Sequence, residues 1–135
     1  MRVLVDTSAW ADFLNAYPSS EGQALAELIA GEDEICTCGV IVAEVFQGLH
    51  RDRACADLRR FFRKLTFLEA SGIDPYLHAS EIYRSLRKRG YTVRSTIDCL
   101  IAVIAQVNGC YVLARDRDME AILRSGVVTA RPWPL

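Results

Sequence analysis

The sequence predicts an α/β fold in which helices cover both faces of a mainly parallel central sheet, a three-layer α/β/α arrangement. Three observations support this prediction. The chain has 135 residues, 51% of them hydrophobic, which suits one domain spanning residues 1–135 with a buried core. Short apolar runs alternate with segments whose apolar residues recur at helical spacing. Strands separated by helices cannot pair as hairpins, so they should lie parallel.

The first half of the chain contains two predicted strands and four predicted helices. In order they are strand RVLV (2–5), helix TSAWADFLNAY (7–17), helix SSEGQALAELIAGE (19–32), strand EICTC (34–38), helix VIVAEVFQGLH (40–50) and helix RACADLRRFFRKL (53–65). Asp6 ends the first strand. The second helix has serine at its start and Gly31 as its terminator. The fourth helix carries an apolar face of Leu58, Phe61, Phe62 and Leu65.

The second half continues the alternation. Its predicted elements are strand TFLEA (66–70), helix DPYLHASEIYRSLRKRG (74–90), helix 96–108, strand YVLA (111–114), helix RDRDMEAILRSG (115–126) and strand VVTA (127–130), followed by the tail RPWPL. Asp74 is expected to cap its helix, with Pro75 in the first turn and Gly90 past the end. The helix from Thr96 is apolar around most of its circumference yet begins with the acid Asp98.

Four acids fall where the strands end and the helices begin: Asp6, Glu44, Asp98 and Asp116. Ligands of open parallel sheets bind at this edge. Each acid alone has a structural explanation, such as a helix cap, a favourable position in a helix dipole, or a turn. Together they are harder to explain, because two carboxylates about 5 Å apart repel by roughly 3 kcal/mol at an effective dielectric constant near 20.

A divalent cation offsets such repulsion, and oxygen ligands select Mg²⁺ or Mn²⁺. A site of this kind suits hydrolysis of phosphodiester bonds, because the cation lowers the pKa of a water and stabilises charge on the phosphate. Ser8 is the nearby hydroxyl, but no histidine is placed to activate it as a nucleophile. We therefore expect Ser8 to orient Asp6 or a water on the cation.

Four segments resemble, in order and spacing, the motifs of PIN-domain ribonucleases, and within that family the VapC toxins of bacterial VapBC toxin–antitoxin modules. They are VLVDTSAWADFL, VIVAEVFQGL, TIDCLIAVIA and VLARDRDME. The resemblance implies a PIN fold, an endoribonuclease dependent on Mg²⁺ or Mn²⁺, a homodimer, and inhibition by a cognate VapB-type antitoxin. It also implies higher-order toxin–antitoxin complexes on DNA, held through the antitoxin.

The resemblance also assigns roles by position. Asp6 and Asp98 match the core metal-binding aspartates of the family, Glu44 its glutamate, and Asp116 its fourth acid, which is also a metal ligand. Asp118, two residues further on, is an alternative fourth acid. The family often has Thr or Asn around the fourth position, where this chain has Ala114, Arg115 and Asp116, so the choice between Asp116 and Asp118 stays open.

The net charge of −1 gives no general attraction to a polyanion, so RNA would have to bind a local patch. The segment YRSLRKRGYTVRS holds the densest basic cluster and is either a solvated helix end or an RNA rim, with Tyr91 available for stacking. Arg94, Arg115 and Arg117 are candidates for contacts to the RNA backbone. We also expect the antitoxin to place a basic side chain among the carboxylates and an apolar segment in a groove near the helices between Ser20 and Lys64.

Two other kinds of protein share features with this sequence. A catalytically inactive PIN-like binding scaffold stays open, whereas a receiver-type phosphoacceptor domain would need an acid pair after the first strand and a late lysine, which the chain lacks. The five cysteines form no CxxC pair and are expected to be buried thiols. No signal peptide or spanning segment is evident, so we expect no membrane association and a cytoplasmic location. Nothing in the sequence indicates which RNA is cut.

Overall fold

The computed structural model describes residues 1–135 and alternates strands with helices. The strands are β1 (Arg2–Val5), β2 (Glu34–Cys38), β3 (Thr66–Leu68), β4 (Tyr111–Leu113) and β5 (Arg131–Pro132). The helices are α1 (Thr7–Leu14), α2 (Ser20–Ala30), α3 (Gly39–Gln47), α4 (Asp52–Phe62), α5 (Asp74–Lys88), α6 (Thr96–Val107) and α7 (Arg117–Arg124). None of these helices is long and apolar enough to cross a membrane.

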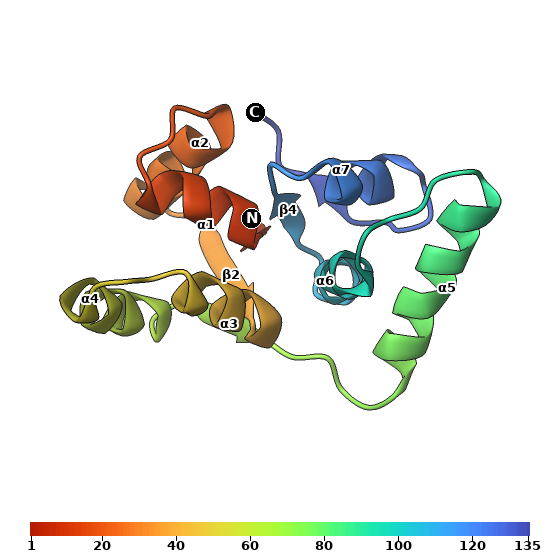
Figure 1. Cartoon of the computed structure of the whole chain (residues 1–135), viewed down its shortest axis with the longest axis horizontal. Helices are drawn as coiled ribbons and strands as arrows, with labels where there is room; N and C mark the ends of the chain where they lie inside the picture. Colours follow the sequence, from red (N-terminus) through yellow and green to blue (C-terminus); the bar gives the residue numbers. More distant parts are fainter.

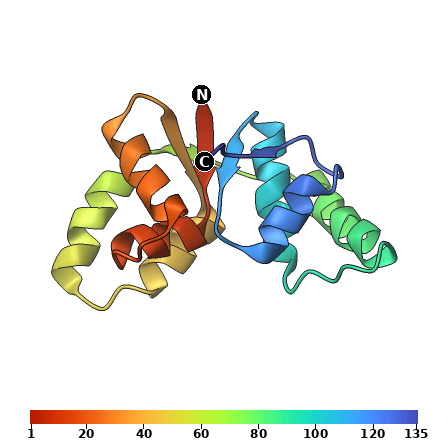
Figure 2. The ribbon, with the colours of Figure 1, turned by 90° about the horizontal axis from the view of Figure 1, so that it is seen from above.

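The five strands form one parallel sheet in the order β3-β2-β1-β4-β5. Helices α1 to α4 lie on one side of the strands and α5 to α7 on the other, which confirms the predicted three layers (Figure 1 and Figure 2). Because crossovers between parallel strands are right-handed, the chain changes faces when its direction across the sheet reverses. That reversal leaves a switch point between β1 and β4, where open α/β sheets bind ligands.

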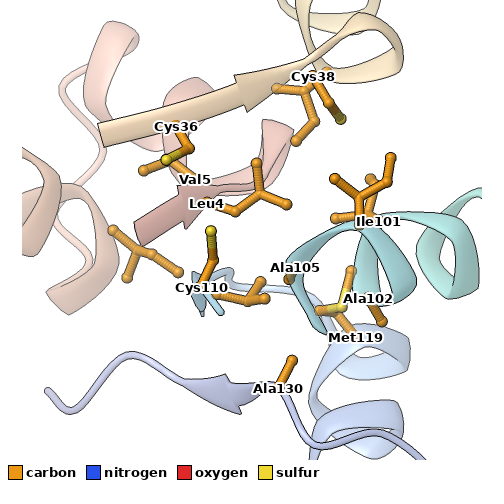
Figure 3. Close-up of a cluster of buried hydrophobic side chains, with 14 of the residues drawn as sticks. Leu4, Val5, Cys36, Cys38, Ile101, Ala102, Ala105, Cys110, Met119 and Ala130 are labelled. Carbon is orange, nitrogen blue, oxygen red and sulfur yellow. The ribbon is translucent and has the colours of Figure 1, made fainter. Parts of the chain in front are cut away.

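The core explains why the central strands read as continuous apolar runs. Leu4 and Val5 of β1 lie within the cluster formed by β2, α6 and α7 (Figure 3). Strands covered on both faces have no solvent side for polar residues. On α6, six residues are buried: Cys99, Ile101, Ala102, Val103, Ile104 and Ala105. All five cysteines are free thiols, and four of them are buried, as expected.

The predicted last strand, VVTA, is wrong. Residues 127–130 form no strand, and β5 comprises Arg131 and Pro132, which lie in the predicted tail. The backbone N–H of Thr129 donates to the side-chain oxygen of Gln106 at 2.8 Å, so this segment is held by α6 rather than by a neighbouring strand. Its two buried residues, Val128 and Ala130, explain the apolar pattern that suggested a strand.

The predicted cap of α5 also differs. Asp74 is the first residue of the helix, and the preceding Ile73, already in a helical conformation, occupies the cap position without a side-chain hydrogen bond. Pro75 lies in the first turn and Gly90 has a φ of 90°, as predicted for the two ends. The helix therefore begins one residue earlier than the capping pattern suggested, because Ile73 adopts helical backbone angles itself.

Candidate active site

Asp6 sits at the switch point, directly after β1. It is 5% exposed and is the N-cap of α1. Its Oδ2 accepts hydrogen bonds from the Ser8 hydroxyl at 2.6 Å and the Ser8 backbone N–H at 3.2 Å. Burial raises the pKa of Asp6, the Ser8 hydrogen bonds oppose this, and the charges on Asp116 and Glu44 raise the pKa further. Asp6 is thus a buried carboxylate close to two others.

Asp98 and Asp116 face each other across the start of α6 and the end of β4. Burial, a hydrogen bond to Asp116 and the charges on Asp116, Asp6 and Asp118 together raise the pKa of Asp98 to about 8. Asp116 is the N-cap of α7, and its Oδ2 accepts a hydrogen bond from the Met119 backbone N–H at 3.0 Å. Asp98 therefore keeps its proton at neutral pH unless a cation replaces that proton.

Glu44 reaches the same edge from the second turn of α3. It is half-buried, and its Oε1 accepts a hydrogen bond from the Thr7 hydroxyl at 2.9 Å. Thr7 is the first residue of α1, so this bond ties the starts of α1 and α3 together. The four acids singled out in the sequence thus lie on one edge of the sheet and sense each other electrostatically.

Asp118 has a different environment from Asp116. It is 3% exposed, and its Oδ1 accepts a hydrogen bond from the Tyr91 hydroxyl at 2.8 Å. Its Oδ2 accepts from both the backbone N–H and the Nε of Arg94, each at 2.9 Å. Burial alone would raise the pKa of Asp118, but these hydrogen bonds outweigh burial and hold the pKa below its usual range. Both oxygens are therefore occupied in holding the loop before α6.

The arginines named as candidate RNA contacts occupy different positions. Arg94 is largely exposed and its Nη2 also donates to Asp116 Oδ1 at 3.0 Å, so it brings a positive charge to the carboxylates. Arg117 is exposed in the first turn of α7. The Arg115 guanidinium instead donates two hydrogen bonds to Asp12, at 2.5 and 2.9 Å, and lies over the Tyr17 ring. Tyr91, considered for base stacking, is tied to Asp118 through its hydroxyl.

The donor set fits a hard divalent cation. No three Asp, Glu, His or Cys side chains are close enough together to form a ready-made metal cage. Mg²⁺, however, is held by one or two carboxylates and keeps several waters. The Asp98–Asp116 pair, whose repulsion is relieved by a proton, and the nearby Asp6 supply oxygen ligands of this kind. The chemistry of the donor set supports the fit, because the carboxylates of Asp6, Asp98 and Asp116 meet at one edge of the sheet, where a cation would offset their mutual repulsion.

Sequence reasoning missed Asp12 and Thr7. Asp12 is 5% exposed although it lies in a segment of helical spacing where one acid would ordinarily face solvent. Its signal is its place one turn after Ser8 and three residues after the buried Ala9. The partner of Asp12 is Arg115, 103 residues away, and no sequence spacing reveals such a contact.

Comparisons with known proteins agree with this geometry. The PIN domain family model matches residues 3–124. VapC ribonuclease Mb1587 of Mycobacterium bovis is 34% identical over 123 residues, which are 90% of this chain and 92% of that protein. VapBC2 from Rickettsia felis, solved with a DNA fragment from its promoter, has a TM-score of 0.72 at 20% identity and covers 99% of this chain and 100% of its own. VapBC-1 from nontypeable Haemophilus influenzae has a TM-score of 0.71 at 15% identity, with coverages of 99% and 97%.

Proposed function

The chain belongs to the PIN domain family and to its VapC group, and on that premise we propose that it is a metal-dependent endoribonuclease, the toxin of a toxin–antitoxin pair. The observation that carries the proposal is the set of carboxylates gathered at the switch point, where burial and the neighbouring carboxylates, Asp116 among them, raise the pKa values of Asp6 and Asp98. A ribonuclease in the same family is 34% identical to this chain, which supports RNA as the substrate.

Mg²⁺ or Mn²⁺ would be held by Asp98, Asp116 and Asp6. When bound, the cation supplies a stabilising charge at the attacked phosphate and acidifies a water molecule. Asp98 loses its proton to become a ligand, and α6 fixes its position because six of the helix residues are buried. Ser8 holds Asp6 Oδ2 with two hydrogen bonds, so Oδ1 is the oxygen that would bind the cation.

Glu44 and two arginines would act on the RNA substrate and the attacking water. Thr7 binds one oxygen of Glu44, and the other oxygen is free to accept a proton from an attacking water. Arg117 lies exposed in the first turn of α7 and can pair with a phosphate beside the cut bond through its whole guanidinium. Arg94 is exposed as well, but its Nε and Nη2 donate to Asp118 and Asp116, so only Nη1 would be available to a phosphate. These contacts would hold the backbone and carry no information about base sequence.

The structure contains a groove that suits an apolar segment of the antitoxin. A groove of about 510 Å³ lies between α3 and α4, within the region predicted for an apolar segment of the antitoxin, and Phe46, Phe62 and Phe67 line it. Arg59 and Arg63 stand among the lining residues. We expect the cognate VapB-type antitoxin to insert an apolar side chain here, with acidic residues beside the two arginines.

Self-association and DNA binding belong to the same proposal. At the start of α5, Ile73, Tyr76 and Leu77 are each half or more exposed, and a homodimer would bury apolar side chains of this kind. The relative from Rickettsia felis was solved as a toxin–antitoxin pair on its promoter DNA. We expect this chain to reach DNA in the same way, through its antitoxin.

The experiment that tests the activity compares cleavage of one RNA and of DNA with the same sequence, in Mg²⁺, Mn²⁺ or EDTA. Wild-type chain should cut RNA only with a cation, and Asp98→Asn should lose about 10³-fold or more in kcat, the scale of losing a major charge-stabilising group. Asp57→Asn, at an exposed acid on α4, is the matched control and should cut normally. Cleavage in EDTA, or full activity of Asp98→Asn, contradicts the proposal. An inactive wild-type chain that still binds antitoxin favours the scaffold alternative.

A further inference from the structure

The strongest unassigned feature is a polar clamp that joins the two sides of the switch point. Asp12 of α1 is buried, and its carboxylate receives the Arg115 Nε on Oδ2 at 2.5 Å and the Arg115 Nη2 on Oδ1 at 2.9 Å. The Ser19 hydroxyl donates to Oδ2 at 2.7 Å. The Arg115 guanidinium also lies 4.7 Å from the centre of the Tyr17 ring. These contacts hold the arginine in one orientation.

The backbone of Arg115 reaches the carboxylates from this fixed position. Its N–H donates to the Ser8 hydroxyl oxygen at 3.0 Å, and the Ser8 hydroxyl donates to Asp6 Oδ2 at 2.6 Å. Because the Ser8 oxygen accepts from Arg115, its single proton is directed to Asp6. One hydrogen-bonded chain therefore runs from Arg115 through Ser8 to Asp6.

The contact between Arg115 and Asp12 also constrains the position of Asp116. Residues 114–116 belong to no helix or strand, and they connect β4 to α7. Asp116 follows Arg115 directly, and its carboxyl faces Asp98. The one backbone–backbone hydrogen bond of this segment is the Asp116 carbonyl accepting from the Glu120 N–H at 2.9 Å, so side-chain contacts must hold the rest of it. The Arg115 side chain makes such a contact with Asp12 of α1, across the switch point.

Direct contact of Arg115 with RNA is disfavoured by the same geometry. Two of its guanidinium nitrogens are taken by Asp12, and the hydrogen bond from Arg115 holds the pKa of Asp12 below its usual range. Leaving Asp12 would strand a buried carboxylate with only Ser19 as partner. Arg115 is thus committed to Asp12 whether or not RNA is present.

We infer that Arg115 is a positioning residue for the cation site, acting through Ser8 on Asp6 and through its own backbone on Asp116. The inference rests on the proposed metal-dependent function. In this role the Asp12–Arg115 pair sets the distance between Asp6 and Asp116, which come from the two sides of the switch point. Outer-shell groups of this kind typically change metal affinity by about 10- to 100-fold when they are altered.

The test uses two variants that avoid an unpaired buried charge. Arg115→Lys keeps a cation for Asp12 but removes the two-pronged geometry, and the double variant Asp12→Asn with Arg115→Gln removes both charges. Arg124→Lys is the matched control, because Arg124 lies on α7 in an exposed ion pair with Glu120. Circular dichroism at low temperature establishes whether each variant is folded. If the double variant does not fold, Arg115→Lys alone is sufficient for the test.

Mn²⁺ affinity is measured by calorimetry without RNA, and kcat and KM are then measured with RNA. We expect both test variants to bind Mn²⁺ about 10-fold more weakly and to lose kcat with KM within about twofold, while Arg124→Lys matches wild type. Unchanged Mn²⁺ affinity overturns the inference. A raised KM with unchanged kcat also overturns it, since Arg115 would then be a substrate contact. Wild-type chain that binds no Mn²⁺ contradicts the proposed function instead.

Discussion

Replacing Asp98 with asparagine should stabilise the cation-free protein at alkaline pH while it removes activity. In the folded chain the pKa of Asp98 is raised from 3.8 to about 8, chiefly by burial and by its hydrogen bond to Asp116. Between these values the folded state binds a proton that the unfolded state releases. Stability therefore falls as the pH rises from about 4 to about 8. Asparagine has no proton to lose, and its amide can donate to Asp116 in place of the carboxyl proton.

The magnitude follows from the same pKa. A rise from 3.8 to about 8 would correspond to about 6 kcal/mol if nothing screened the charge. Asp98 is only half-buried, and solvent screening reduces the penalty to about 1–2 kcal/mol. For a chain of this length that difference corresponds to roughly 3–8 °C in melting temperature. The gain should be largest at pH 8 and only about a third as large at pH 5, where folded wild-type Asp98 is protonated but the unfolded chain has already released the proton.

The assay is thermal unfolding in EDTA at pH 5 and pH 8, repeated with Mg²⁺. The melting temperature of Asp98→Asn should exceed that of wild type clearly at pH 8 and by only about a third as much at pH 5. Added Mg²⁺ should raise the melting temperature of wild type and leave Asp98→Asn nearly unchanged, since a cation stabilises only the state it binds. Asp57→Asn, at an exposed acid, should follow wild type throughout. Equal melting of Asp98→Asn and wild type at pH 8 would refute the argument that Asp98 is ionised at a cost.

Three further changes test other parts of the structure. Asp118→Asn removes a buried charge that accepts three hydrogen bonds, and it should lower the free energy of unfolding by about 2–3 kcal/mol in urea titrations; a loss under 0.5 kcal/mol contradicts its anchoring role. Gln106→Ala leaves the Thr129 N–H without its partner and should cost about 1 kcal/mol in the same titrations, with no change as the adverse result. Arg63→Glu reverses a charge in the groove between α3 and α4 and should weaken antitoxin binding about fivefold or more in a direct binding assay, whereas Arg53→Glu, on the exposed face of α4, should not; equal affinities would remove the groove from the antitoxin proposal.

The sequence predicts the fold and the place of the acids because both follow from local rules. Apolar runs and helical spacing fix where strands and helices lie, and the carboxyl ends of parallel strands then meet at one edge. Asp6 follows β1 directly and Asp116 comes three residues after the end of β4, so their convergence needs little more than the strand order. The strand predicted at 127–130 fails for a different reason: its backbone is bound by Gln106, and alternating burial looks the same whether a ladder or a side chain holds the segment.

The choice between Asp116 and Asp118 shows what spacing alone cannot decide. Both acids lie at the start of one helix, two residues apart, so a sequence pattern treats them as equivalent. The structure separates them by burial and by their partners. Asp118 is 3% exposed and accepts three hydrogen bonds from Tyr91 and Arg94, whereas Asp116 is less buried, accepts one hydrogen bond on each oxygen and also faces Asp98. A carboxylate held by several hydrogen bonds has little reason to take a cation, and one paired with a second carboxylate has a strong one. We therefore propose that Asp116 is the acid that binds the cation, while Asp118 keeps Arg94 beside it.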